Sequence, residues 1–270
     1  MLTSRWWVRN MKTIRVILAT MRMQMASTFA RPLTRFCMLV YPVIHLVLLY
    51  EMYDHSGEQN FTSYVILSSG LAGTWYSICY ASGNNINHER WIGTLPSLFV
   101  APVKFVWIIC GKIIGNTVIS LSSVAVSFLL ALLLFDMPVV IAEPLLFAVS
   151  LLLVIICFSA IATLFAYLIT LSRKSSTYIE CINIPISLLC GFLFPIEVLP
   201  RWPQYISWCL SPTWAVKLMR LSVAGFGNIN EFLIPMGILL GEIFIYIVIF
   251  AMLYRKFDNA VRVRATLEVA

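Results

Sequence analysis

Long apolar runs separated by short polar segments make up most of the chain. Six of the runs are long enough to cross a hydrocarbon core of about 30 Å as α-helices. They cover residues 36–53, 64–86, 105–135, 144–171, 177–194 and 232–254. The first run is short and contains Pro42, so its bounds are the least sharply defined. The pattern predicts an all-α polytopic membrane protein with six transmembrane helices.

Residues 1–35 precede these runs and follow a different pattern, with seven Lys and Arg residues and no acid. Apolar residues recur at alternating spacings of four and three, while Arg5, Arg9 and Lys12 share another face. The apolar stripe consists of Trp7, Met11, Ile14, Leu18, Met21 and Met25. This predicts a basic amphipathic helix lying in the headgroup plane. An Arg-rich, acid-free start also resembles a mitochondrial transit peptide, but the segment runs almost directly into the first span, which favours a retained helix.

The composition agrees with a single transmembrane domain over residues 1–270. The chain is 60% hydrophobic and 11% charged, with a mean hydropathy of +0.89, which excludes a soluble domain. The seven cysteines form no CxxC pair and lie mostly in apolar runs, and the three histidines are scattered. Neither a disulfide framework nor a metal site is predicted.

The charged residues are distributed unequally between the two sides of the predicted membrane. With the N-terminus inside, sixteen of the 19 Lys and Arg residues fall in cytoplasmic segments. The external segments hold Glu51, Asp54, Glu58, Asp136, Glu143, Glu197 and Glu231. By the positive-inside rule, both termini are predicted to be cytoplasmic. This topology accounts for the net charge of +7, so no nucleic-acid partner is predicted.

Two segments between the runs are unusual. Residues 87–104, NHERWIGTLPSLFVAPVK, are too short and too charged to cross a bilayer. The helical spacing of Trp91, Leu95, Leu98 and Pro102 predicts a short amphipathic element on the cytoplasmic surface, where a soluble partner can act. An interfacial loop helix without a partner is the alternative interpretation.

Residues 195–225 are broken by four prolines yet are too apolar for a free loop. Ser211 and Pro212 predict the N-cap and first position of a helix, and Gly225 can end it. Together with three tryptophans suited to the lipid–water interface, they predict a pair of short re-entrant helices in the outer leaflet. An extracellular loop resting on the bilayer is the alternative.

Polar residues inside the runs are candidates for a substrate pathway. The second run is rich in small polar residues and glycines, which either pack tightly against another helix or line a hydrated path. For the glycines, tight packing is the favoured interpretation. Gly111 and Gly115 form a GxxxG pair, which favours helix packing. Glu242, in the sixth run, is either a substrate or proton contact or a hydrogen-bonded structural carboxyl. The pathway candidates are Ser69, Thr74, Tyr76, Ser77, Asn84, Asn183 and Glu242. For Asn183 and its neighbour Glu180, pairing with Arg173 or Lys174 is the favoured interpretation.

No catalytic motif is present. The sequence contains no GxxxxGK[ST] phosphate loop, no HExxH and no GxSxG. No catalytic residue or bound cofactor is therefore predicted, and energy for uphill transport must come from a partner or from an ion gradient.

The two unusual segments, in their positions after the second and fifth runs, resemble type-2 ABC exporter permeases. These are membrane subunits related to daunorubicin-type drug, lipo-oligosaccharide and polysaccharide exporters. The resemblance covers nearly the whole chain. Its first motif runs from Glu89 to Leu95 and continues with Ala101-Pro102-Val103. Its second motif comprises residues 191–195, Leu199-Pro200, Trp202, Ser211-Pro212 and Arg220.

The resemblance implies a separate ATPase subunit, which would hold ATP and Mg²⁺ and dock under residues 87–104, hereafter the coupling segment. It implies the coupling residues Glu89, Arg90, Trp91, Gly93, Thr94, Leu95, Leu98 and Pro102. It also implies an extracellular gate formed by Phe194, Pro195, Glu197, Pro200, Trp202, Pro212 and Arg220. Where the family often has an acid after Gly-Thr-Leu, this chain has Pro96, which predicts two short helical pieces, one ending near Leu95 and one beginning at Pro96.

A further implication is a permease dimer of two identical chains or of two paralogues. The dimer would lie in the plasma membrane, which in a bacterium is the inner membrane. The pathway would run between the copies, lined mainly by the second and fifth spans. The apolar, aromatic outer region suits an amphipathic or lipid-like cargo such as a drug, peptide or glycolipid. The main alternative is a stand-alone ion-coupled transporter that uses Glu242. A membrane enzyme acting on lipid-linked substrates, with Glu197, Arg201 and Arg220, is a weaker third hypothesis.

Overall fold

The computed structural model describes residues 2–54, 61–94, 97, 105–135, 141–170 and 175–267. This part of the chain is helical throughout, with short turns and no strand. Its helices are α1 (Leu2–Ala30), α2 (Pro32–Asp54), α3 (Phe61–Ile92), α5 (Phe105–Ser120), α6 (Ser122–Phe135), α7 (Pro144–Thr170), α8 (Ser175–Leu189), the 3-10 helix η1 (Ile196–Val198), α9 (Arg201–Trp208), α10 (Ser211–Ala224) and α11 (Ile229–Leu267).

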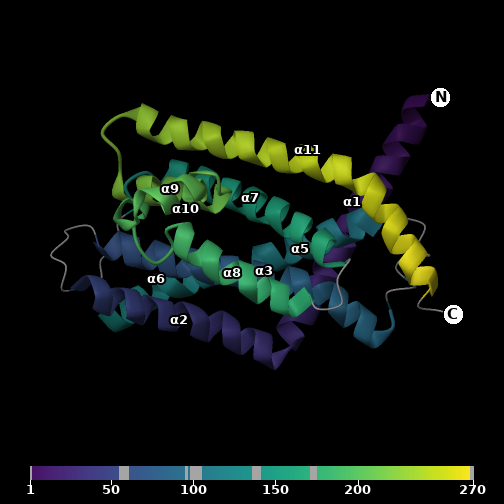
Figure 1. Ribbon diagram of the computed structural model, residues 1–270, viewed down its shortest axis with the longest axis horizontal. Helices are drawn as coiled ribbons and strands as arrows, with labels where there is room; N and C mark the ends of the chain where they lie inside the picture. Colours follow the sequence, from purple (N-terminus) through teal and green to yellow (C-terminus); the bar gives the residue numbers. More distant parts are fainter. Residues whose placement is uncertain are drawn as a thin grey trace.

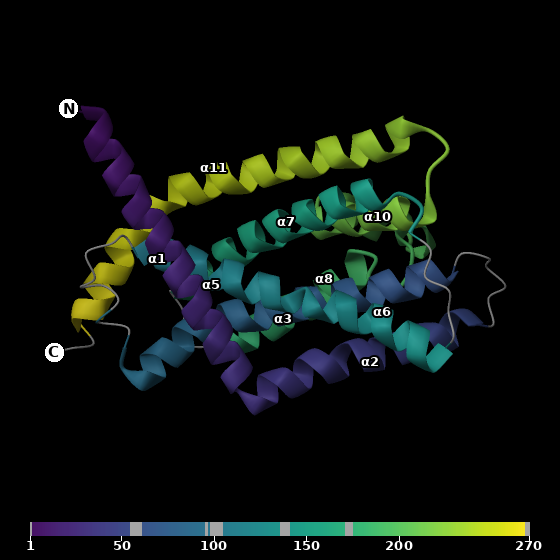
Figure 2. The same ribbon diagram turned by 180° about the vertical axis from the view of Figure 1, so that it is seen from behind.

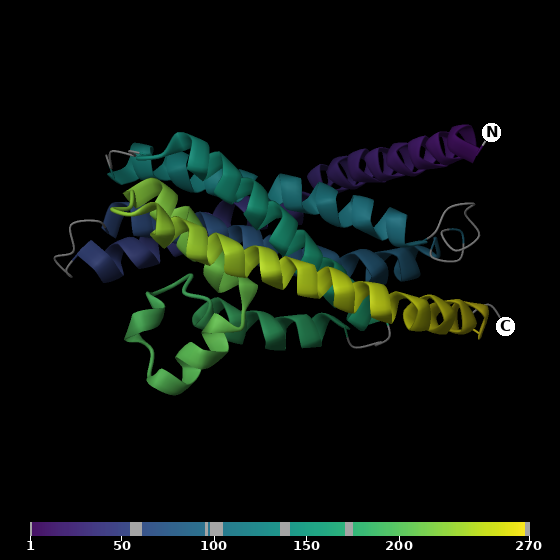
Figure 3. The same cartoon turned by 90° about the horizontal axis from the view of Figure 1, so that it is seen from above.

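The long helices lie roughly along the longest axis of the molecule, and both chain termini are at one end of it (Figure 1). We call this the terminal end; α3 ends there, and α5 begins there. The short helices α9 and α10 lie at the opposite end, beside the start of α11. Helix α1 crosses the bundle obliquely at the terminal end (Figure 2). Seen from above, α1 and α9 lie on opposite sides of the bundle (Figure 3).

Helix α3 is the central element of the bundle. All residues from 65 to 75 are buried, and α3 contacts α2, α5, α6, α7, α8 and α10. Its glycines permit this packing: a Cβ at Gly70 would lie 2.8 Å from the Cα of Val124, and one at Gly73 would lie 3.1 Å from Cγ of Pro42. Tight packing, the interpretation favoured for these glycines, is confirmed.

The predicted third span, residues 105–135, consists of two helices separated by Leu121. The hydroxyl of Thr74 donates to the Ser120 carbonyl at 3.0 Å, and the Val124 N–H instead donates to the Leu121 carbonyl at 3.0 Å. A side chain that enters the backbone ladder in this way interrupts a helix. The fifth run is also shorter than predicted, because α8 ends at Leu189 and is followed by Gly191 with a φ of +76°.

Large apolar side chains cover the outside of the bundle. On α11, Phe244 and Met252 are 67% and 72% exposed. Among the described residues, three segments are long and apolar enough to cross a membrane: Val106–Leu133, Pro144–Phe165 and Ile229–Met252. A water-exposed surface of this kind would be unstable in a soluble monomer, so the protein is integral to a membrane.

Helix α1 packs against α5 through the two glycines of the GxxxG pair. A Cβ at Gly111 would lie 2.8 Å from the Ile17 carbonyl oxygen, and one at Gly115 would lie 2.9 Å from that of Met21. Helix packing is thus confirmed as the role of this pair. In the predicted apolar stripe, Ile14 and Leu18 are 56% and 49% exposed. The side chains of Trp7 and Met11 lie outside the described residues, and placement in the headgroup plane stays a prediction.

Candidate functional site

The first part of the coupling segment is the end of α3. Residues 87–92 continue this helix without a break, so the first of the two predicted pieces is the end of a long helix and not a short piece, and it ends at Ile92. The helix ends because Gly93 adopts a φ of +76°, and the Thr94 N–H donates to the Glu89 carbonyl at 3.0 Å. This is the Schellman arrangement of a glycine-terminated helix. Leu95, Pro96, Leu98 and Pro102 lie outside the described residues, as do the side chains of Arg90 and Trp91.

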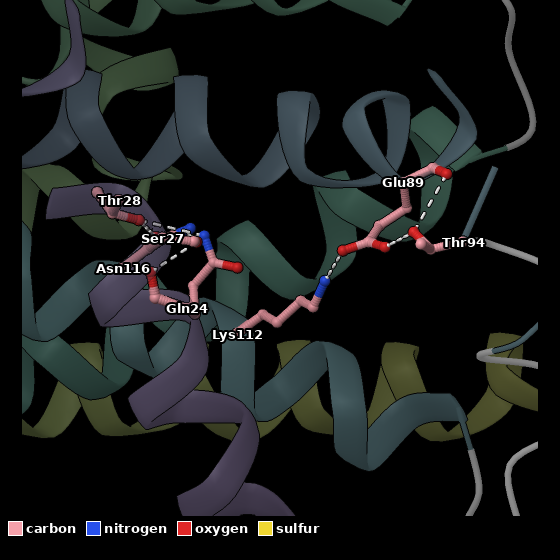
Figure 4. A network of polar contacts seen from close by, with 7 residues as sticks. All are labelled: Gln24, Ser27, Thr28, Glu89, Thr94, Lys112 and Asn116. Atoms are coloured by element: carbon pink, nitrogen blue, oxygen red, sulfur yellow. Dashed lines mark hydrogen bonds and ion pairs between the residues drawn. The ribbon is translucent and has the colours of Figure 1, made fainter. Parts of the chain in front are cut away.

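The Glu89 side chain is directed towards α5, where it forms an ion pair with Lys112 (Figure 4). The Lys112 ammonium donates to Oε1, and the Thr94 hydroxyl donates to Oε2. The Lys112 and Glu89 side chains are only 6% and 17% exposed. A buried ammonium needs a carboxylate partner, because desolvation of an unpaired charge is costly. Lys112 is one of the sixteen Lys and Arg residues predicted to be cytoplasmic; its position seven residues inside an apolar run was the sequence signal for a buried charge.

One turn further along α5, a second polar cluster joins α5 to α1 (Figure 4). The Asn116 Oδ1 atom accepts hydrogen bonds from Gln24 Nε2 and from the Thr28 hydroxyl, both at 3.1 Å. Gln24 also donates to Thr28 at 3.2 Å. All three side chains are at most 4% exposed. Helix α1 therefore directs small and polar side chains towards the protein, with the exposed Ile14 and Leu18 on its outer side.

The pathway candidates on α3 make contacts within the chain. Ser69 donates to the Ile66 carbonyl at 2.9 Å, and Thr74 donates to the carbonyls of Gly70 and Ser120. Ser77 accepts from the Ser120 hydroxyl at 2.9 Å. The Tyr76 ring stacks on Tyr41 with 4.4 Å between centroids. A pathway role for these residues stays a prediction, and the Asn84 side chain lies outside the described residues.

Asn183 and Glu242 each carry a buried oxygen without a hydrogen-bond partner in the described part of the chain. Asn183 is 6% exposed on α8, whereas Glu242 is half-buried on α11. Glu242 lies one turn before Tyr246, whose hydroxyl accepts a hydrogen bond from Ser211 at 3.2 Å. Arg173 and Lys174, the suggested partners of Glu180 and Asn183, lie outside the described residues. Both interpretations of Glu242 stay predictions.

The predicted pair of short helices in residues 195–225 corresponds to α9 and α10, preceded by η1. Ser211 is not an N-cap: Leu210 occupies that position, and the Ser211 hydroxyl donates to Tyr246 instead. Pro212 lies in the first turn of α10, and Gly225 ends this helix with a φ of +82°. The gate candidates Trp202 and Glu197 are exposed, whereas Pro212 is buried. Phe194 and Pro195 are partly buried, and Pro200 is exposed.

Arg220 on α10 joins three segments at the opposite end of the bundle. Its guanidinium lies over the Tyr64 ring, 3.7 Å from the centroid. The same group donates to the Ser68 hydroxyl at 2.8 Å and to the Gly191 carbonyl. Tyr64 and Ser68 belong to the start of α3, and Gly191 follows α8. Arg220 therefore fixes α10 to the helix whose other end carries Glu89.

Comparison with family models identifies the class of protein. Residues 15–223 match the model of the ABC-2 type transporter, a match that extends from α1 into α10. The chain belongs to the ABC-2 type transporter family, and it is the membrane subunit of an ABC transporter. The comparison with curated proteins gave no match.

Proposed function

We propose that the protein is an ATP-driven export permease without a catalytic site of its own. A separate ATPase subunit, holding ATP and Mg²⁺, docks at the coupling segment, and a second permease copy or a paralogue completes the transporter. The observation that carries the proposal is the continuity of α3, which runs for 32 residues from the Arg220 contacts to the capped end at Gly93. At 1.5 Å per residue this is about 48 Å, enough to cross a bilayer.

Six membrane crossings are part of this proposal. Helices α2, α3, α7 and α11 have 23, 32, 27 and 39 residues, and the pair α5–α6 provides one further pass. Helix α8 has only 15 residues, about 22 Å. The turn after it and the helices α9 and α10 complete the sixth crossing from the outer leaflet. Such irregular backbone at membrane depth is tolerated where protein surrounds it, as around the buried Phe192.

The charges support a cytoplasmic location of the terminal end. Arg15 and Arg22 lie on α1, Arg31 lies between α1 and α2, and Arg35 lies at the start of α2. Acids mark the opposite end: Glu143 precedes α7, Glu197 lies in η1, and Glu231 lies in the first turn of α11. By the positive-inside rule, both termini face the cytoplasm. The transporter lies in the plasma membrane, which in a bacterium is the inner membrane.

In this mechanism, closure of the ATPase subunits on ATP displaces the coupling segment, and α3 transmits the displacement. Because α3 is buried on all sides in its middle, it moves together with its neighbours. At the opposite end the motion reaches α10 and the turn at Gly191 through Arg220. The region 195–225 then opens the outward exit. Motion of one packed element against another is a known form of switching.

The outer region fits an amphipathic or lipid-like cargo. On α9, Trp202, Tyr205 and Trp208 are 70%, 63% and 48% exposed. Exposed aromatic rings with polar edges suit molecules that have both apolar and polar parts. The cargo class is part of the proposal.

The test is purification of the tagged permease from its native membrane, followed by transport into proteoliposomes. We expect an ATP-binding subunit to co-purify and transport to require hydrolysable ATP. Glu242, with its unpartnered buried Oε2 atom, supports the alternative of an ion-coupled transporter. Transport driven by an ion gradient, without the ATPase and lost in Glu242→Gln, would replace the proposal by that alternative.

A further inference from the structure

The carboxylate of Glu89 is engaged inside the permease. Lys112 binds Oε1 and Thr94 binds Oε2, and the side chain is 17% exposed. A group that docks an ATPase needs accessible oxygens, whereas this carboxylate has both oxygens occupied by its own chain. The geometry therefore separates Glu89 from the docking residues implied by the family resemblance.

Lys112 has one charged partner among the described residues. Its side chain is 6% exposed, and its pair with Glu89 is the only ion pair in the described part of the chain. It is also the only charged residue of α5. A nearly buried ammonium is stable only while its carboxylate stays in place. The pair is thus a strong and specific connection between α5 and the last turn of α3.

The same turns of α5 hold α1. Gly111 precedes Lys112 and contacts Ile17 and Thr20, and Asn116 follows one turn later with its hydrogen bonds to Gln24 and Thr28. All these contacts lie before the helix break at Leu121. The end of α3, the first half of α5 and the second half of α1 are consequently joined by buried polar contacts over a short length of α5 (Figure 4).

We propose that Lys112 and Glu89 are positioning residues that make α1 and α5 move together with the coupling segment. This inference rests on the proposed function, since it supposes an ATPase that displaces the segment. A displacement of the segment moves the Glu89 carboxylate. The ion pair with Lys112 transmits this displacement to α5, and the Asn116 cluster transmits it to α1. The ATPase itself contacts other residues of the segment.

A charge swap tests this role. The variants are Glu89→Lys, Lys112→Glu and the double variant, with Glu231→Lys as a control that makes the same charge change at an exposed position of α11. Each is purified with the ATPase, and export per ATP hydrolysed is measured in proteoliposomes. We expect each single variant to lower this ratio about tenfold or more, because it breaks a buried pair, and the double variant to recover most of it.

Retention of the ATPase is the second readout, and it distinguishes positioning from docking. We expect all variants to retain the ATPase. If Glu89→Lys loses the ATPase whether residue 112 is Lys or Glu, Glu89 is a docking residue and the inference is overturned. If the wild type neither binds an ATPase nor exports with ATP, the proposed function has failed instead.

Three further variants, none of which reverses a charge, keep the test decisive should the swapped chains fail to reach the membrane. Lys112→Arg preserves the charge, so we expect it to keep most of the export per ATP, whereas Lys112→Met should lose it with the ATPase still bound. Asn116→Leu should lower export per ATP in the same way, because it removes the acceptor for Gln24 and Thr28. Export at the wild-type ratio in both Lys112→Met and Asn116→Leu would overturn the inference.

Discussion

The two ends of α3 are each held by a basic side chain, but by different chemistry. At the terminal end, Lys112 pairs with a carboxylate, and the contact depends on opposite charge. At the opposite end, Arg220 uses an aromatic face, a hydroxyl and a backbone carbonyl. These partners need a planar group with several donors in fixed directions. The first contact can therefore be rebuilt with exchanged charges, whereas the second requires arginine.

The largest effect on stability is expected for Glu89→Ala. It leaves the Lys112 ammonium buried without a carboxylate, which costs about 3–5 kcal/mol for a buried pair. Thermal unfolding of the purified complex in detergent measures it, with the exposed Glu231→Ala as the control. An unchanged unfolding temperature would show that solvent reaches Lys112 and that the two ends do not differ as described.

A smaller effect is expected for Arg220→Lys, about 2–3 kcal/mol, because lysine cannot stack on Tyr64 while donating to Ser68 and Gly191. The control on the same helix is Lys217→Arg, an exposed position where the exchange should have little effect. The same unfolding measurement applies. Full stability of Arg220→Lys would mean that charge alone suffices at this end, as it does at the other.

A still smaller loss of stability is expected when the contact of α1 with α5 is disturbed. Gly111→Ala places a Cβ closer than van der Waals contact allows, 2.0 Å from the Thr20 hydroxyl and 2.8 Å from the Ile17 carbonyl oxygen. Overpacking of this kind costs about 1–3 kcal/mol. Gly237→Ala on α11 is the matched control, since a Cβ there meets no atom of the described residues within 4 Å. Equal stability of the two variants would show that α1 is not packed tightly against the part of α5 that Lys112 connects to α3.

Local patterns predicted the helical part of the fold well. Long apolar runs fall on the long helices, and Gly225 ends α10 as expected. These features depend on neighbouring residues: hydropathy sets a run, and a left-handed glycine ends a helix. The start of the coupling segment was harder to predict. No residue between Asn87 and Ile92 stops a helix, so α3 continues up to Gly93.

The contacts that define the candidate site depend on residues far apart in the chain. Gln24 meets Asn116 across 92 positions, and Arg220 meets Ser68 across 152. The break at Leu121 arises from Thr74 on another helix. Ile14 and Leu18 of the apolar stripe are exposed, whereas the side of α1 that packs on the protein is marked by the buried Gln24 and Thr28. Periodicity alone does not say which face a membrane helix turns to its neighbours.

The most direct test of ATP coupling through residues 87–104 is the export by Gly93→Trp. No atom of the described residues lies within 4 Å of a Cβ at Gly93, and the strain of a side chain at a φ of +76° is about 1–2 kcal/mol, so the variant should fold and reach the membrane. The indole would then alter the surface next to the α3 end without touching the core. In proteoliposomes containing the ATPase, we predict ATP hydrolysis to continue while export is lost. Export at the wild-type rate would contradict the account.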